Sequence, residues 1–426
     1  MKNCMAILCL SLLLPGPAIA QDMPYAREVV QTLASESFQG RGYVGYGNKR
    51  AAEYMCSQFE QIGLKPLKKS YIQPFTTPVN TFPGKMELTL DGSEKTPGID
   101  FLIDAGSPGI QGTYHTVTLT IEQMLDLNRL TAQLKTASGK FLVIPAYNKD
   151  DYSKEQQSQI ADVINFVKYG KDCPAAGSIV CTNDKLTWDA STTRSLKPSF
   201  TIVNDSTHLN IQEVKVDVEN TFIPKFESQN IIGYTEGENP DSLIVFVAHY
   251  DHIGMMGEST IFPGANDNAS GVAMLLNMAK YYQTKKPKYN MVFIAFGGEE
   301  LGLVGSKYFV EHPLFKLSKI KFLINFDLAG TGEEGIQVVN GKQYKDRFDR
   351  LVEINKDHNL LAQVKIRGEA CNSDHCLFYM KKVPCFFIYT LGGIKAYHDV
   401  FDKSETLPLT EFEDYFKLVT LFVNGL

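Results

Sequence analysis

Apolar residues follow two different rhythms along the chain. From residue 230 onward, short continuous apolar runs alternate with stretches in which apolar residues recur every three or four positions. The runs at 243–248 and 291–296 contain no charged residue, as is typical of strands buried on both faces of a sheet. The intervening stretches have the spacing of amphipathic helices. This alternation predicts an α/β fold with a mostly parallel sheet flanked by helices.

Six strands and five helices are expected in this part of the chain. The strands are placed at 230–234, 243–248, 289–296, 321–326, 335–339 and 383–391, and the helices at 270–284, 301–311, 343–359, 373–380 and 409–422. Nearer the N-terminus, apolar residues at helical spacing predict helices at 26–33 and 49–62, with Gly63 as a C-terminal cap. Residues 71–75 fit an edge strand.

Residues 83–222 have a different pattern of apolar and polar positions. Short β-like runs at 85–90, 116–121, 140–145, 177–181 and 199–203 are separated by polar stretches, which predicts a separate strand-rich unit. This unit holds the only tryptophan, Trp188, and no cluster of metal-ligand residue types, so we expect an accessory role for it. The expected division is a signal at 1–20, an N-terminal segment of the catalytic domain at 21–82, an inserted accessory domain at 83–222 and the catalytic domain at 223–426.

The length of the chain bounds its number of domains, and its charge limits the classes of partner. A chain of 426 residues suggests roughly two to three domains. The net charge is −6 and no block of basic residues is present, which argues against a nucleic-acid partner.

Residues 1–20 have the composition of a secretory signal. A lysine stands near the start, a short apolar segment follows, and Ala18-Ile-Ala20 provides a small-residue cleavage site. The apolar segment is too short to cross a membrane, and no later run approaches ~20 apolar residues. We therefore expect an exported protein, periplasmic or secreted, without a membrane span.

Six cysteines follow this signal, and an even number in an exported protein is compatible with disulfides. The pairs that lie close in sequence are Cys173 with Cys181 and Cys371 with Cys376. Buried thiols are the alternative for each pair, because connectivity does not follow from sequence.

Polar residues with metal-binding chemistry leave the ends of the expected strands. They are His249 after 243–248, Asp267 before the helix at 270, Glu299 and Glu300 after 289–296, Asp327 after 321–326, and His398 in the loop after 383–391. Each residue alone could be a hydrogen-bonded surface group, and Asp267 could be a helix cap. Because carboxyl ends of parallel strands meet at one edge of a sheet, we expect these side chains to gather there.

This set of side chains suits a pair of divalent ions. Zinc binds histidine nitrogen and carboxylate oxygen, and catalytic zinc sites leave a position for water. Two zinc ions need a carboxylate that reaches both, and Asp267, on a short glycine-bounded loop, is the candidate bridge. One of the adjacent glutamates can then bind metal while the other takes a proton from water.

These residues resemble the co-catalytic dizinc peptidases, a family that includes bacterial leucyl aminopeptidases, glutamate carboxypeptidase and, more distantly, glutaminyl cyclases. The matching motifs are His249-Tyr-Asp251, Gly264-Ala-Asn-Asp267-Asn-Ala-Ser-Gly271, Glu299-Glu300-Leu-Gly, Gly305-Ser306, Asn325-Phe-Asp327, Ser373-Asp374-His375 and Tyr397-His398. The segment from Arg41 to Gly63 resembles the N-terminal segment of the family, and residues 83–222 weakly resemble a protease-associated insert.

The resemblance implies a zinc aminopeptidase-like fold, two zinc ions and peptide substrates. It implies that His249 and Asp327 hold one zinc, that Glu300 and His398 hold the other, that Asp267 bridges them, and that Glu299 is the general base. Asp251 would accept a hydrogen bond from the His249 ring, and Asp402 would either do the same for His398 or be a surface carboxylate. Ser373, Asp374 and His375 would line the substrate pocket, stiffened by a Cys371–Cys376 bridge.

An exported metallo-aminopeptidase is therefore the expected function, with a carboxypeptidase or a glutaminyl cyclase as the alternative on the same fold. A carboxypeptidase needs a cationic group for the substrate carboxylate, and Arg367 is the only nearby candidate. Cyclase pockets of this family are lined by tryptophan, whereas Trp188 lies in the insert. A binding protein without activity would have lost metal ligands, and all six positions are intact here.

A dinucleotide-binding pattern is also present at 330–335, where Gly-Thr-Gly-Glu-Glu-Gly follows an expected strand. The next residues form another strand pattern instead of the helix that a phosphate site requires, so nucleotide binding is not expected.

Overall fold

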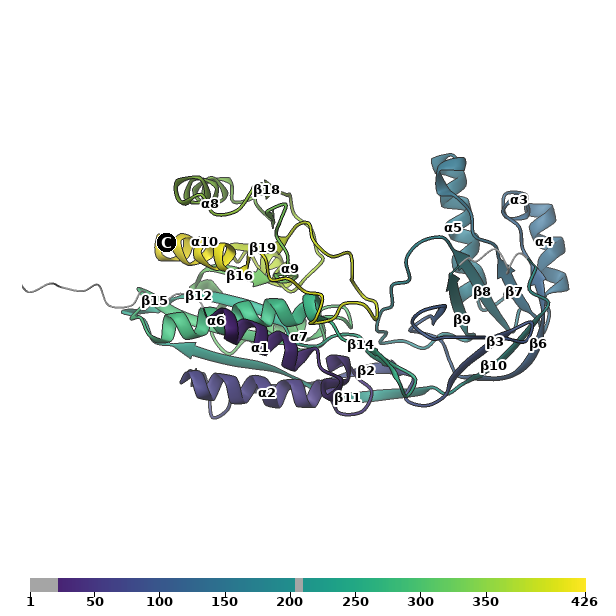
Figure 1. Ribbon diagram of the computed structural model, residues 1–426, viewed down its shortest axis with the longest axis horizontal. Coiled ribbons are helices and arrows are strands. Elements are labelled where there is room, and N and C mark those ends of the chain that lie inside the picture. Colours follow the sequence, from purple (N-terminus) through teal and green to yellow (C-terminus); the bar gives the residue numbers. More distant parts are fainter. Residues whose placement is uncertain (1–21, 204–209) are drawn as a thin grey trace, which may run out of the picture.

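The computed structural model describes residues 22–203 and 210–426, which fold around two large sheets and a small hairpin. Figure 1 shows the first sheet and its helices in one half of the molecule, and the second sheet with helices α3, α4 and α5 in the other. The predicted signal at 1–20 lies outside the described residues. Among the described residues, no helix is long and apolar enough to span a membrane.

The first sheet has nine strands in the order β1-β11-β15-β12-β16-β19-β17-β18, with β2 also paired to β11. The strands are β1 (Lys65–Pro66), β2 (Ile72–Thr81), β11 (Thr221–Thr235), β12 (Asn239–His249), β15 (Tyr289–Phe296), β16 (Ile320–Phe326), β17 (Ile336–Val339), β18 (Val364–Ile366) and β19 (Cys385–Thr390). The four central strands β15, β12, β16 and β19 are parallel. Antiparallel pairs β11–β15 and β17–β19 adjoin this centre, and the edge pair β17–β18 is parallel again, so the sheet is mixed and the parallel arrangement we predicted dominates its centre.

Both faces of the central strands are covered by helices, as their continuous apolar sequences predicted. Along β12, Ile244, Phe246 and Ala248 belong to one core, while Val245 and Val247 belong to another on the opposite face. The helices of the first core are α1 (Met23–Leu33), α2 (Gly47–Ile62), α6 (Gly271–Gln283), α8 (Lys345–His358) and α10 (Phe412–Asn424), and those of the second are α7 (Val304–Glu311) and α9 (His375–Met380). Gly63 caps α2 in the left-handed conformation, at φ 85°.

The second sheet has eight strands in the order β4-β3-β10-β6-β7-β8-β9-β5. They are β3 (Met86–Leu90), β4 (Ser93–Lys95), β5 (Phe101–Ile103), β6 (Ile110–Thr118), β7 (Phe141–Ile144), β8 (Gly177–Thr182), β9 (Ser199–Val203) and β10 (Glu213–Val218), with helices α3 (Ile121–Met124), α4 (Leu127–Thr136) and α5 (Lys154–Tyr169). We did not predict α5 in the polar stretch before β8. Only Ile160, Val163 and Val167 of its residues are buried, and a Ser153–Gln156 capping box starts it.

A two-stranded ribbon connects the two sheets. Strand β2 leads from the first half toward the second, and β11 returns beside it in antiparallel register, with Thr81 opposite Thr221 and Ile72 opposite Ile231. A hairpin of β13 (Gly254–Met256) and β14 (Thr260–Phe262) also packs into the core of the second sheet through Met256 and Phe262. The second sheet is therefore joined to the loop that follows His249 as well as to the ribbon.

One of the two candidate disulfides is formed. Cys371 and Cys376 are bonded, at a Cα–Cα separation of 4.9 Å. Cys173 and Cys181 are both buried and are not joined by a disulfide.

Candidate metal centre

The candidate site lies at the carboxyl end of β12, in the middle of the first sheet. The chain continues from β12 to β15 on one side and then to β16 on the other, so β12 marks the point at which the strand order reverses. Ligands of open α/β sheets bind at such switch points, outside the carboxyl ends of the strands. His249 ends β12, Glu299 follows β15 and Asp327 follows β16, as we predicted from the pattern of strand ends.

The Asp267 carboxylate faces two separate groups of side chains, one with each oxygen. Its Oδ1 lies 3.4 Å from His249 Nε2, which is also 3.5 Å from Asp327 Oδ1. Its Oδ2 lies 3.1 Å from His398 Nε2, which is also 3.2 Å from Glu300 Oε2. The five predicted metal ligands are thus brought together as two sets that share Asp267.

His252 is a member of this cluster that we did not predict. Its Nδ1 donates to Glu300 Oε1 at 2.7 Å, and its side chain is fully buried. Its Nε2 meets no hydrogen-bond partner among the described residues. The sequence carried one weak signal for His252, namely its position directly after the His249-Tyr-Asp251 motif.

The Asp251 carboxylate supports the two glutamates, which corrects our prediction that it accepts from the His249 ring. Its oxygens accept from the backbone amides of Glu299 at 3.2 Å and Glu300 at 3.3 Å, and from the Tyr43 hydroxyl at 2.5 Å. The nearest Asp251 carboxylate oxygen is 3.9 Å from His249 Nδ1. That ring nitrogen donates instead to the backbone carbonyl of Asp251, at 3.2 Å.

Burial and neighbouring charges shift the pKa values of the two adjacent glutamates in opposite directions. Burial raises the pKa of Glu299 well above its ordinary value, and the Glu300 carboxylate adds to this effect. Burial alone would raise the pKa of Glu300 too, but His398 and His252 lower it well below its ordinary value. Such a separated pair is the arrangement in which one carboxylate stays ionised while the other exchanges protons.

Two buried groups hold the loop that carries Asp267. The Asp402 carboxylate accepts from the amides of Asn266, at 2.8 and 3.0 Å, and Asp267, at 3.0 Å. Asp402 is therefore neither a partner of His398 nor a surface carboxylate. The Arg41 guanidinium donates to the carbonyls of Tyr250, Leu33, Pro263, Gly264 and Asp267, at 2.7–3.1 Å.

The Ser373-Asp374-His375 segment contacts the cluster through Asp327, and all three side chains are fully buried. The Ser373 hydroxyl donates to Asp327 Oδ2 at 2.9 Å and accepts from Asn325 at 2.7 Å. His375 donates from Nε2 to the Ala370 carbonyl at 3.0 Å. Burial raises the pKa of Asp374 to about 7 and lowers that of His375 to about 4. Their role in lining the substrate pocket stays a prediction.

The charge balance of the site fits bound cations. Carboxylates crowd the carboxyl end of β12, and they are Asp251, Asp267, Glu299, Glu300, Asp327, Asp374 and Asp402. Arg41 is the one Arg or Lys buried in the described part of the chain, and its five N–H groups are all directed at carbonyls. Buried carboxylates at this density need compensating positive charge, which divalent ions would supply.

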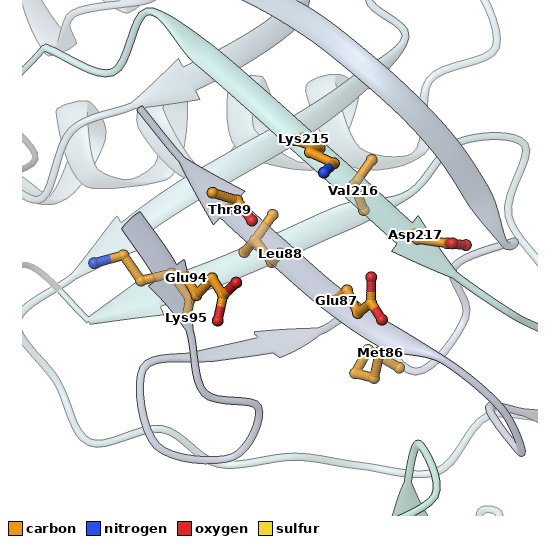
Figure 2. A pocket seen from close by; sticks show the side chains of 9 residues that line it. All are labelled: Met86, Glu87, Leu88, Thr89, Glu94, Lys95, Lys215, Val216 and Asp217. Atoms are coloured by element: carbon orange, nitrogen blue, oxygen red, sulfur yellow. The ribbon is translucent and has the colours of Figure 1, made fainter. Parts of the chain in front are cut away.

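A pocket of about 280 Å³ on the second sheet is a different kind of feature. It is lined by β3, β4 and β10, and Figure 2 shows Glu87, Glu94, Lys95, Lys215 and Asp217 among its side chains. Both acidic and basic groups line it, and none of its lining residues is a histidine or a cysteine. This pocket therefore lacks the mixed nitrogen and oxygen ligands that gather at β12.

Most of the first sheet is similar in sequence to a family of peptidases. Residues 230–423 match the model of Peptidase family M28. The chain is 30% identical over 229 residues to aminopeptidase YwaD of Bacillus subtilis (strain 168), covering 47% of this chain and 48% of that relative. It is 36% identical over 119 residues to an aminopeptidase of Pseudomonas aeruginosa (strain UCBPP-PA14), covering 28% and 21%. The chain thus spans about half or less of the length of these relatives.

Solved structures resemble the chain over nearly its whole length. BSAP, a zinc aminopeptidase from Bacillus subtilis, matches with a TM-score of 0.69 at 21% identity, covering 94% of both chains. A peptidase M28 precursor from Shewanella amazonensis SB2B matches with a TM-score of 0.70 at 16% identity, covering 94% of this chain and 92% of that one. The α/β fold that we predicted, similar to that of zinc aminopeptidases, is thereby confirmed.

Proposed function

We propose, from the match of residues 230–423 to the model of Peptidase family M28, that the protein is an exported zinc-dependent exopeptidase that removes residues from the N-terminus of peptides. The observation that carries the proposal is the placement of Asp267 between two sets of side chains. Each set pairs a histidine nitrogen with a further carboxylate, which is the chemistry that zinc prefers.

Two zinc ions would occupy the two sets. We assign His249 and Asp327 to one ion, His398 and Glu300 to the other, and Asp267 to both. Bound zinc would polarise the substrate carbonyl and lower the pKa of water. His252 would hold one oxygen of Glu300, so that the other remains directed at the ion.

Glu299 is the proposed general base. As the water oxygen bonds to the carbonyl carbon, Glu299 takes the proton that the water loses. It then gives this proton to the leaving nitrogen as the C–N bond breaks, so the enzyme ends each cycle unchanged. Two observations support this assignment. The raised pKa makes the Glu299 carboxylate a stronger proton acceptor, and the hydrogen bond from its backbone amide to Asp251 holds the residue beside the ligands.

The charges around the site favour an aminopeptidase over a carboxypeptidase. A free substrate amine would be attracted by the excess of carboxylates. A substrate carboxylate would need a cation, and the candidate Arg367 donates from Nη1 to the Tyr389 hydroxyl at 3.0 Å. The buried Arg41 is bound to backbone carbonyls.

We also propose the domain division and the location that the sequence suggested. Residues 21–82 and 223–426 would form the catalytic domain, and residues 83–222 the inserted domain. The proposal of export, to the periplasm or outside the cell, depends on the signal-like composition of residues 1–20.

Purified mature protein loaded with zinc tests the proposal, when offered the same peptide with free ends, with a blocked N-terminus or with a blocked C-terminus. We expect cleavage of the free and C-blocked peptides and none of the N-blocked peptide. Cleavage of the N-blocked but not of the C-blocked peptide would overturn the aminopeptidase assignment. Glu299→Gln is the matched variant, expected to keep two zinc equivalents and to lose turnover; normal turnover would refute the assigned base.

A further inference from the structure

We infer that the loop between β8 and β9, residues 183–198 (the Trp188 loop), positions the proposed zinc ligand His398 and so makes the second sheet part of the active site. The inference rests on the proposed function, because it treats His398 as a zinc ligand. It departs from our expectation that residues 83–222 carry no chemistry.

The His398 ring is held from the side that faces away from the cluster. Its Nδ1 lies 2.8 Å from the Trp188 carbonyl and 3.2 Å from Asp189 Oδ1. A carbonyl oxygen only accepts, so Nδ1 carries the proton of this bond. The other nitrogen, Nε2, is thereby directed at Asp267 and Glu300 as the nitrogen available to a metal ion.

The same loop holds the backbone of His398. The Trp188 amide donates to the His398 carbonyl at 2.9 Å, so the two residues are joined by two hydrogen bonds. His398 has a φ of 51°, in the left-handed region that a residue other than glycine adopts only when its surroundings hold it there. The Trp188 loop supplies part of that constraint.

The Trp188 loop is itself held by contacts of the Trp188 side chain and of Lys185. The indole of Trp188 stacks on Phe262, at 4.9 Å between ring centroids, and donates from Nε1 to the Ile103 carbonyl at 2.7 Å. Lys185 Nζ reaches the C-terminal segment, 2.6 Å from Asp399 Oδ2 and 2.7 Å from the Lys395 carbonyl. The loop is therefore a fixed support for His398.

The path of the loop is unusual for its position in the sheet. Strands β8 and β9 are parallel neighbours, and such strands are ordinarily joined by a crossover containing a helix. The Trp188 loop contains no helix and extends instead to His398.

The other proposed histidine ligand, His249, is held by the carbonyl of Asp251 in its own segment. Among the described residues, the His398 ring thus has a hydrogen bond to the second-sheet segment, whereas the Nδ1 of His249 is held within its own segment.

The test measures zinc affinity in the full chain, by competition with a chromogenic chelator. Trp188→Ala keeps the backbone carbonyl but removes the indole that anchors it, so we expect one of two zinc equivalents to bind up to ~10–100-fold more weakly and the other to bind as in the wild type. Trp188→Phe keeps the stacking on Phe262 but loses the indole N–H, and should loosen the same equivalent by a smaller factor. Ile202→Ala is the matched control, because it opens the core of the second sheet at a residue of β9, outside the Trp188 loop.

A second pair of variants keeps the test decisive if Trp188→Ala does not fold. The Asp189 side chain is 78% exposed, so its replacement leaves the core intact. Asp189→Ala should loosen one equivalent, and Asp189→Asn should restore it, since its amide oxygen still accepts. Two outcomes would overturn this inference and leave the proposed function standing. One is wild-type affinity for both zinc equivalents in Trp188→Phe and in Asp189→Ala. The other is equally weakened binding of both equivalents in these variants and in Ile202→Ala. A wild-type protein that binds no zinc would overturn the proposed function as well.

Discussion

Replacing Arg41 by lysine is the sharpest test of how the Asp267 loop is held. The guanidinium is fully buried and directs Nε at the Tyr250 carbonyl, Nη1 at Leu33 and Pro263, and Nη2 at Gly264 and Asp267. Its five N–H groups are all used. Burial lowers the pKa of Arg41 to about 10, so the side chain is still charged at neutral pH.

The cost of Arg41→Lys follows from this count. An ammonium has three N–H groups radiating from a single atom, so at least two of the five carbonyls lose their partner. A buried acceptor left without a partner costs ~1–3 kcal/mol, which gives about 2–6 kcal/mol for two of them. Natural domains are stable by ~5–15 kcal/mol, so the variant should fold but unfold at a clearly lower urea concentration.

Urea unfolding of zinc-free protein, followed by circular dichroism, measures this effect without interference from metal binding. Arg27→Lys is the matched control, because Arg27 lies on the surface and its guanidinium donates to one carbonyl, that of Pro408, among the described residues. A change within about 0.5 kcal/mol is expected there. An Arg41→Lys protein with the unfolding midpoint and zinc affinity of the wild type would refute the reasoning.

Three further predictions concern other parts of the molecule. Asp402→Ala should lower the free energy of unfolding by about 2–4 kcal/mol, because the buried amides of Asn266 and Asp267 lose their acceptor; an unchanged urea midpoint would contradict this. Removal of zinc with a chelator should lower the melting temperature and re-addition should restore it, since a ligand at 100 times its Kd stabilises by ~2.7 kcal/mol; equal melting curves would argue against a bound metal. Asp104, held by Lys168 at 2.8 Å, has a lowered pKa despite its burial, so its contribution is present above its unfolded pKa and is lost as pH falls through its folded pKa. Asp104→Asn should therefore cost about 2–4 kcal/mol at pH 7 and progressively less as pH falls through the folded pKa, whereas a cost independent of pH would refute this account.

The strands of the first sheet and the gathering of ligands at its edge were predictable from the sequence. Parallel strands buried on both faces leave continuous apolar runs, and 291–296 falls within β15 (Tyr289–Phe296), two residues short of the glutamates. The left-handed cap at Gly63 was predictable because glycine adopts that conformation without steric cost. These features depend on residues close together in the chain.

Contacts between distant segments left no such signal. Trp188 and His398 are 210 residues apart, and the atom that Trp188 offers to the His398 ring is a backbone carbonyl, which any residue possesses. The partners of Asp251 were wrong in our prediction for a similar reason, because two of them are backbone amides. Helix α5 was missed because its buried stripe is narrow and its remaining surface is polar.

The ribbon of β2 and β11 brings the two ends of the second-sheet segment to adjacent positions, since Thr81 is paired with Thr221. Partner residues of antiparallel strands lie ~4.5–5.5 Å apart at their Cα atoms, a gap that a tight turn closes. A shortened gene joining these two positions through a turn would keep the nine-stranded sheet, while exposing Met256 and Phe262 and removing the Trp188 carbonyl from His398. The same junction would accept other modules, so this ribbon is a natural graft point for changing what is presented to the catalytic face.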